Sequence, residues 1–144
     1  MYTFPKQQRL NSYKRISLLF TNGNPLLLWP LSIRYVVREG HGDVSVVINC
    51  PKRYQKLAVN RNRIKRLIRE NYRRKSADIR IYAMQKKIDI DLAITYISKE
   101  MISYEQMREK IMEVFSLLKE NIIYLQEEHF SKQTLKDEVR NENI

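Results

Sequence analysis

One basic segment, residues 58–75, constrains the fold of this chain more than any other stretch. It contains eight Lys or Arg residues and one acid, Glu70. At ~100° per residue, a helix here would carry apolar side chains on one side and arginines on the other. The apolar side holds Ile64, Leu67, Ile68 and Asn71, and the opposite side holds Arg66, Arg69 and Arg73 with Asn62 beside them. The spacing predicts an amphipathic helix that packs on a core and presents a row of guanidinium groups outward.

The charge is distributed unevenly along the chain, whose formal net charge is +11. Residues 1–75 carry 17 basic and three acidic residues, whereas residues 119–144 carry four basic and six acidic residues. Planar, permanently charged guanidinium groups suit phosphates, and counterion release favours binding to a polyanion, so nucleic acid is the leading partner. An acidic membrane surface is the weaker alternative, because the apolar side of the helix is too narrow for a typical interfacial helix.

The single cysteine, Cys50, excludes an intrachain disulfide and fits a reducing compartment. Because it ends a strand-like run, we expect it to be a buried small side chain. No apolar run reaches the ~20 residues that span a bilayer, and the first residues lack the charged start and apolar stretch of a signal peptide. We therefore expect a cytoplasmic protein.

Hydrophobic periodicity predicts six elements in the order helix, strand, strand, helix, strand, helix. Their expected bounds are 12–21, 26–38, 44–50, 58–76, 88–97 and 103 onward. Ser12 is the expected N-cap of the first helix, and Ser103 with Gln106 forms a capping box for the last. The turn residues 22–25 end the first helix, and residues 39–43 are expected to join the first two strands as a hairpin.

This order predicts an α+β protein, an α/β sandwich with one sheet. Pro30 is expected near the start of the first strand or at a bulge, because it cannot donate to a strand ladder. Residues 1–118 form the expected domain. Residues 119–144 form a C-terminal extension, helical at first and frayed or disordered from residue 126, where periodicity is lost. The predicted core residues of the last helix are Met107, Ile111, Val114, Phe115 and Leu118.

The sequence contains no recognisable reaction centre. The histidines are His41, in a Gly-flanked turn, and His129, near the C-terminus, and no Cys or His spacing fits a metal site. Asp89 and Asp91 alternate along a strand and therefore share one side of it. They could hold a divalent ion, but flanking the polar side of an edge strand is the favoured interpretation.

Two further groups of residues extend the predicted binding surface. Lys52, Arg53 and Lys56 form a basic loop before the arginine-rich helix, and several aromatics lie near the basic elements in sequence: Phe20, Tyr35, Tyr54 and Tyr72. Unpaired bases stack on exposed aromatic side chains. Plain core packing is an equal alternative for Phe20. Because Tyr35 alternates with Arg34, one of the two faces open sheet or helix.

The segment Arg61–Arg69, Arg-Asn-Arg-Ile-Lys-Arg-Leu-Ile-Arg, resembles the signature of the protein component of bacterial ribonuclease P. The similarity extends over roughly residues 4–118. Supporting matches are Phe4-Pro5-Lys6, Arg9-Leu10, Phe20, the strand Val44–Ile48 with Lys52-Arg53, and Ile90–Tyr96.

The resemblance implies an α/β sandwich with a small mixed sheet and a left-handed βαβ crossover, like the second domain of a small-subunit ribosomal protein. It implies a subunit that binds a large catalytic RNA and the single-stranded 5′ leader of precursor tRNA. The holoenzyme is an endonuclease that removes the leader, with Mg²⁺ bound mainly by the RNA and no catalytic residue in the protein. Neither DNA nor a membrane is expected as a partner.

Carried onto this sequence, the resemblance implies two sets of site residues. The RNA-binding set is Arg61, Asn62, Arg63, Lys65, Arg66, Arg69, Arg73, Lys52 and Arg53. The leader-cleft set, between the central helix and the sheet, is Phe20, Tyr35 and Ile16. The chain departs from the family at Ile16, where some members have an aromatic residue, in the second strand, which lacks a common glycine, and in the extension 119–144.

Two other classes of function remain open from the sequence. A structural or ribosomal-type RNA-binding protein would share the charge and the basic helix but would have no role in processing. A self-sufficient protein nuclease would need a carboxylate cluster beyond Asp89 and Asp91.

Overall fold

A four-stranded mixed sheet organises the computed structural model, which describes the backbone of residues 9–142 and the side chains of residues 9–126. The elements are α1 (Tyr13–Asn22), β1 (Asn24–Leu28), β2 (Leu31–Glu39), β3 (Val44–Asn49), α2 (Ala58–Lys75), α3 (Ala77–Lys86), β4 (Ile88–Tyr96) and α4 (Tyr104–Glu142). The strand order is β1-β2-β4-β3. The β1–β2 and β2–β4 pairs are antiparallel, and β3–β4 is parallel. The α+β class predicted from the sequence is confirmed.

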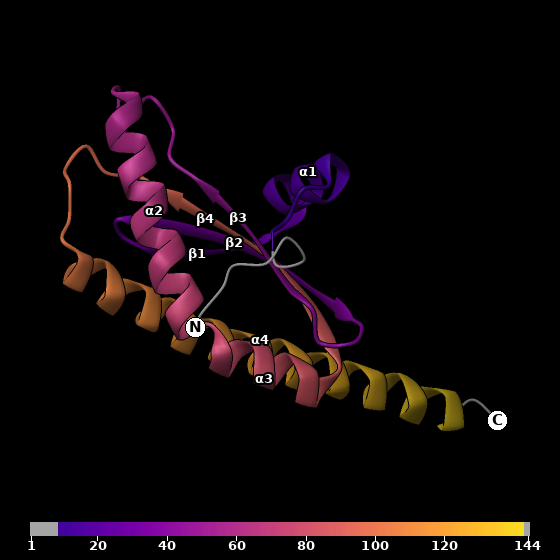
Figure 1. Cartoon of the computed structure of the whole chain (residues 1–144). Helices are drawn as coiled ribbons and strands as arrows, with labels where there is room; N and C mark the ends of the chain where they lie inside the picture. The colour runs from indigo at the N-terminus through magenta and orange to yellow at the C-terminus, as the bar shows by residue number, and fades with distance from the viewer. Residues whose placement is uncertain (1–8, 143–144) are drawn as a thin grey trace.

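The two faces of the sheet carry different helices. On one face, the core face, the alternate residues of β4 pack with α2, α3 and α4 in the main core. These β4 residues are Ile88, Ile90, Leu92, Ile94 and Tyr96, all buried. On the other face, the α1 face, a small cluster of Leu10, Leu19 and Ala93 attaches α1. Figure 1 shows α1 on the opposite side of the sheet from α2 and α4.

The predicted helix caps and the amphipathic helix of the basic segment are confirmed by the structure. The Ser12 side chain accepts a hydrogen bond from the Arg15 amide, and Ser103 and Gln106 bond reciprocally at 3.0 and 3.2 Å, as a capping box does. In α2, Ile64 and Ile68 are buried, and the buried Asn71 donates its side-chain amide to the Leu67 carbonyl. The predicted core residues of α4 are also buried.

The strand expected within residues 26–38 is β2, and Pro30 lies directly before its start, as predicted. The additional strand β1 was not predicted; it forms a hairpin with β2 through Trp29 and Pro30, whose peptide bond is cis. Pro30 has no N–H to donate, so the ladder is interrupted there. The turn expected at residues 22–25 does end α1, but its last two residues already belong to β1.

The hairpin expected around residues 39–43 is wrong. β4 lies between β2 and β3, so those two strands are not neighbours. The loop instead wraps around Asp89 of β4, whose Oδ1 accepts the amides of His41, Gly42 and Asp43 at 2.9–3.1 Å. Gly42 has a φ of 103°, a conformation that favours glycine. β4 is therefore a central strand, not the edge strand considered for Asp89 and Asp91.

One helical feature differs from the prediction. α3 was not expected from the sequence; it ends at Lys86 and is capped by Lys87, whose φ is 54°. α4 continues to Glu142 and reaches well past the sheet (Figure 1), and the frayed or disordered tail expected from residue 126 stays a prediction. No Gly or Pro follows Pro51, so nothing in the sequence breaks this helix. The domain boundary at residue 118 stays a prediction, and Phe4-Pro5-Lys6 and His129 lie outside the described side chains.

None of the helices in the described part of the chain has the length and apolarity needed to cross a membrane.

Candidate nucleic-acid interface

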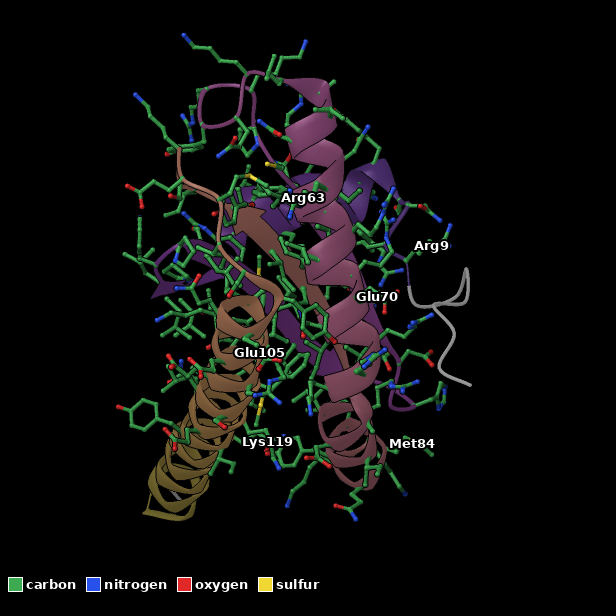
Figure 2. All side chains as sticks on the ribbon, turned by 60° about the vertical axis from the view of Figure 1, so that its left-hand side comes forward. Arg9, Arg63, Glu70, Met84, Glu105 and Lys119 are labelled. Atoms are coloured by element: carbon green, nitrogen blue, oxygen red, sulfur yellow. The ribbon has the colours of Figure 1, made fainter. Side chains whose placement is uncertain are left out.

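The outer side of α2 is an exposed row of basic residues on a firmly anchored helix. Arg63, Arg66 and Arg69 are exposed, together with Asn62 of the predicted set, and Lys65 is half-buried. The inner side is anchored by buried residues, and the ring of Tyr72 lies 5.7 Å, centroid to centroid, from that of Phe115 on α4. Figure 2 shows Arg63 and Glu70 along α2. Because the core fixes the helix backbone, it also fixes the points from which the outer arginine side chains extend.

The acid in this helix neutralises only one end of the row. Glu70 pairs with Arg73 at 2.6 Å and approaches Arg74 at 3.9 Å. Among the described residues, no acidic side chain lies within ion-pair distance of Arg66 or Arg69. A hollow of about 280 Å³ is lined by Arg66, Arg69, Glu70 and Arg73. Several guanidinium groups around one hollow form a geometry suited to phosphate oxygens.

Arg61 differs from the rest of the predicted RNA-binding set. Its guanidinium donates to the carbonyls of Gln55 and Lys56, at 3.0 and 2.7 Å, and so holds the basic loop against the start of α2. The loop is fixed at a second point because the buried Gln55 side chain donates to the Ser98 carbonyl at 2.9 Å.

The other loop cations are exposed beside this anchor. Lys52 and Arg53 are both exposed, and the Arg53 guanidinium lies 5.0 Å from the centroid of the Tyr54 ring. Nearby, Cys50 is buried, and burial raises the pKa of its thiol although Arg61 and Lys65 oppose the shift. This agrees with the structural role predicted for Cys50.

The structure separates the residues predicted to line the leader cleft. Phe20 is 41 % exposed on α1, and Ile16, about one helical turn before it, is half-buried and packs on the α1 face. Tyr35 lies on the core face and is only 3 % exposed. Burial raises the pKa of Tyr35, and a hydrogen bond with Asn121 of α4 opposes the shift.

This separation corrects the expected position of the cleft. The space between α2 and the sheet is filled by core side chains, such as Ile64 and Ile68, so Tyr35 is not available there for stacking. Tyr72 is buried as well. Arg34, which alternates with Tyr35 along β2, lies on the α1 face, where its guanidinium donates to the Gly23 carbonyl at 3.2 Å.

The α1 face contains a row of accessible residues, which we call the open row: Leu27, Ser32, Thr95 and Asn49, cross-strand neighbours in β1, β2, β4 and β3. Leu27 and Asn49 are exposed, and Ser32 and Thr95 are half-buried. α1 advances along β4 from Asp91, which Arg15 contacts, to Ala93, which packs with Leu19. Phe20 is the next residue of α1 after Leu19 and is exposed, and Thr95 is the next residue after Ala93 on this face of β4.

Both strand carboxylates on the α1 face are occupied by donors of the protein. Asp91 is 3 % exposed and accepts hydrogen bonds from Arg15 Nε at 3.1 Å and from Arg38 at 2.8 Å. Burial would raise the pKa of Asp91, but these two arginines outweigh it and hold the pKa below its usual value. Burial would also raise the pKa of Asp89, but the hydrogen bonds from the loop amides outweigh burial and lower this pKa. The described residues contain no group of three or more potential metal ligands.

Sequence analysis did not identify the group formed by Arg15, Arg38 and Asp91. The residues come from α1, β2 and β4. The β2–β4 register, which pairs Val36 with Asp91, and the packing of α1 on the sheet bring them together. The alternation of Arg34 and Arg38 along one strand was the available signal, but it did not specify a partner.

Comparisons with known proteins agree with this architecture. The model of the Ribonuclease P family matches residues 4–119. The ribonuclease P protein components of two Porphyromonas gingivalis strains are each 29 % identical to this chain over 98 residues, which cover 67 % of it and 72 % of the relative.

Solved structures of similar fold come from more distant relatives. A mutant of the Staphylococcus aureus RNase P protein aligns with a TM-score of 0.61 at 19 % identity, covering 79 % of this chain and 90 % of that chain. The Thermotoga maritima RNase P protein aligns with a TM-score of 0.57 at 22 % identity, covering 74 % and 94 %. At these identities, the likeness shows a shared fold.

Proposed function

This chain belongs to the ribonuclease P protein family, and from that premise we propose that it binds the catalytic RNA of ribonuclease P and the 5′ leader of precursor tRNA. In this role it assists the Mg²⁺-dependent endonucleolytic removal of the leader. The action takes place in the cytoplasm. The two RNA ligands occupy different faces of the protein.

The outer side of α2 binds the catalytic RNA. The observation that carries this assignment is the pair of exposed arginines, Arg66 and Arg69, which have no acidic partner among the described residues and line one hollow. A guanidinium without an internal acid partner can exchange its counterions for backbone phosphates, which is the main source of RNA affinity. Lys52 and Arg53 extend the same basic surface beyond the start of α2.

The leader lies on the α1 face. A single strand offers unpaired bases, which stack on an exposed aromatic side chain and bond to polar side chains along their edges. Phe20 provides the aromatic side chain, and Ser32, Thr95 and Asn49 of the open row provide hydroxyl and amide groups. Double-stranded RNA would not gain the same stacking, so this face favours the unpaired segment.

The protein contributes binding and orientation to the reaction. Mg²⁺ held mainly by the RNA subunit supplies the hydrolytic chemistry in this proposal. By holding both the catalytic RNA and the leader, the protein reduces the entropy cost of bringing the scissile phosphate to the metal.

Cleavage of a precursor tRNA at low Mg²⁺ tests this function. We expect rapid removal of the 5′ leader when the catalytic RNA and the protein are combined, and little cleavage by either component alone. Unchanged cleavage on adding the protein, with RNA binding intact, would instead favour a structural RNA-binding protein. Cleavage by the protein alone would identify a self-sufficient nuclease.

A further inference from the structure

α1 is attached to the sheet by a thin apolar contact. Leu19 is its only fully buried residue, and it packs with Leu10 and Ala93. The other apolar contacts, from Ile16 and the neighbouring strand residues, are partly buried. A helix of ten residues held by so little apolar area depends on polar contacts for its exact position.

The strongest polar contact of α1 is the ion-pair network around Asp91. This carboxylate is buried on the central strand and accepts hydrogen bonds from Arg15 of α1 and Arg38 of β2. Arg15 contacts both oxygens, one through Nε and the other through a terminal guanidinium nitrogen. A two-point contact with a planar guanidinium fixes orientation as well as distance.

These two arginines are committed to the protein, unlike those of α2. Asp91, Asp89 and Asp43 all act electrostatically on Arg15. These three carboxylates outnumber the two guanidinium groups of Arg15 and Arg38, so this group of residues is poorly suited to bind a phosphate. Its acids and bases are better explained by the placement of α1.

We propose that Asp91 is a positioning residue for leader recognition, because its contacts with Arg15 and Arg38 fix α1, and thereby the exposed Phe20, on the α1 face of the sheet. Phe20 follows Arg15 by little more than one helical turn, so a shift of Arg15 moves the stacking side chain directly. A displacement of about 1 Å in a supporting contact is enough to weaken a binding site. The inference rests on the leader assignment above, and it predicts an effect confined to the leader.

The test compares precursor tRNAs that differ only in leader length, bound to the holoenzyme. Asp91→Asn keeps the size of the side chain but removes the charge that pairs with both arginines. We expect it to weaken binding of a long-leader precursor by about fivefold or more, part of the effect of losing one stacked base. Binding of a precursor with a one-nucleotide leader, and of the catalytic RNA, should change by less than about twofold, because α2 is untouched.

Asp89→Asn is the matched control. Asp89 lies on the same strand and the same face, but its Oδ1 accepts loop amides and not the Arg15 guanidinium. This variant should leave the difference between long and short leaders unchanged. Asp91→Glu, which restores the carboxylate, should recover part of the long-leader affinity.

Three results would overturn the inference. Equal weakening of long-leader and short-leader precursors by Asp91→Asn would indicate a general structural role. Unchanged binding of both would show that the network does not position α1 for the leader. If Asp91→Asn does not fold, Arg15→Lys keeps the charge but loses the two-point contact, and an unchanged leader preference in that variant would refute the inference. If the wild-type protein shows no leader preference at all, the proposed leader function fails instead.

Discussion

The arginines on the outer side of α2 and those at the contact between α1 and the sheet have the same side chain but opposite electrostatic surroundings. Arg66 and Arg69 stand on the outer side of α2 with no acidic partner among the described residues, beside a single acid that pairs further along the helix. Arg15 and Arg38 converge on the buried carboxylate of Asp91. The first group has its charge available for a polyanion, whereas the second uses its charge to hold a helix on a sheet.

The comparison shows that the charge of a segment overestimates its RNA-binding surface. The first 75 residues are strongly basic, yet several of their arginines serve internal acceptors. Arg34 donates to the Gly23 carbonyl and Arg61 to carbonyls of the basic loop, in addition to the two arginines at Asp91. Acid partners and carbonyl acceptors, more than the number of arginines, distinguish a binding surface from a scaffold.

The largest expected effect is on the α2 side of the comparison. Replacing Arg66 and Arg69 together by Ala should weaken binding of the catalytic RNA and lower the log–log salt slope by about 0.7–0.9 per lost phosphate contact. Stability should change by less than about 0.5 kcal/mol, because both side chains are exposed. Filter binding across a salt series measures the slope. An unchanged slope would mean that these side chains do not face RNA.

The second effect separates the two faces of the sheet. Phe20→Ala should cost about 1–3 kcal/mol of affinity for a single-stranded leader oligonucleotide, the range for one stacked base. Tyr35→Phe, its aromatic counterpart on the core face, should leave that affinity unchanged because Tyr35 is buried. Fluorescence anisotropy with a labelled oligonucleotide tests both variants. A loss in Tyr35→Phe and none in Phe20→Ala would reverse the assignment of the faces.

The third effect is a pH dependence on the α1 side. The pKa of Asp91 is lowered in the folded protein, so its stabilising contribution is present above the unfolded pKa of ~3.9 and is lost as the pH falls through the folded value. The free-energy gap between the wild type and Asp91→Asn should be full at pH 7 and shrink below about pH 4. Asp89 and Asp43 also act on Arg15, but they are present in both proteins, so the difference isolates Asp91. Urea unfolding at a series of pH values would show this, and a gap independent of pH would contradict it.

The smallest effect concerns the acid within the α2 row. Glu70→Gln removes the partner of Arg73 and Arg74 and should make the salt slope for catalytic RNA steeper by up to about 0.9. The lost surface ion pairs should cost at most about 1 kcal/mol of stability. A slope that stays at the wild-type value would place Arg73 and Arg74 outside the RNA contact.

The sequence predicted the elements whose signals are local. α2, β4 and the capped starts of α1 and α4 were correctly located, because amphipathic spacing, strict alternation and side-chain caps are readable within one segment. The pattern of α3 is less clear. Its buried Ile79, Tyr82 and Ala83 do lie at helical spacing, but the exposed Ile81 and Met84 add apolar side chains on the opposite side, so the contrast between the two sides is weak.

The features missed by sequence analysis depend on pairing between distant segments. The insertion of β4 between β2 and β3 is a tertiary event that no turn motif encodes. The same pairing decides that Arg34 faces α1 and Tyr35 faces the core, a choice that alternation alone leaves open. The Asp91 network follows from that register, and for this reason it emerged only from the structure.

The most direct test of the account is a crosslinking experiment on the assembled holoenzyme with a precursor tRNA. A photoreactive phenylalanine analogue is placed at position 66 in one variant and at position 20 in another, after each is shown to support leader cleavage. The account predicts crosslinks from position 66 to the catalytic RNA and from position 20 to the 5′ leader. Crosslinks from both positions to the same RNA, or in the reverse order, would contradict the assignment of two RNA ligands to two faces.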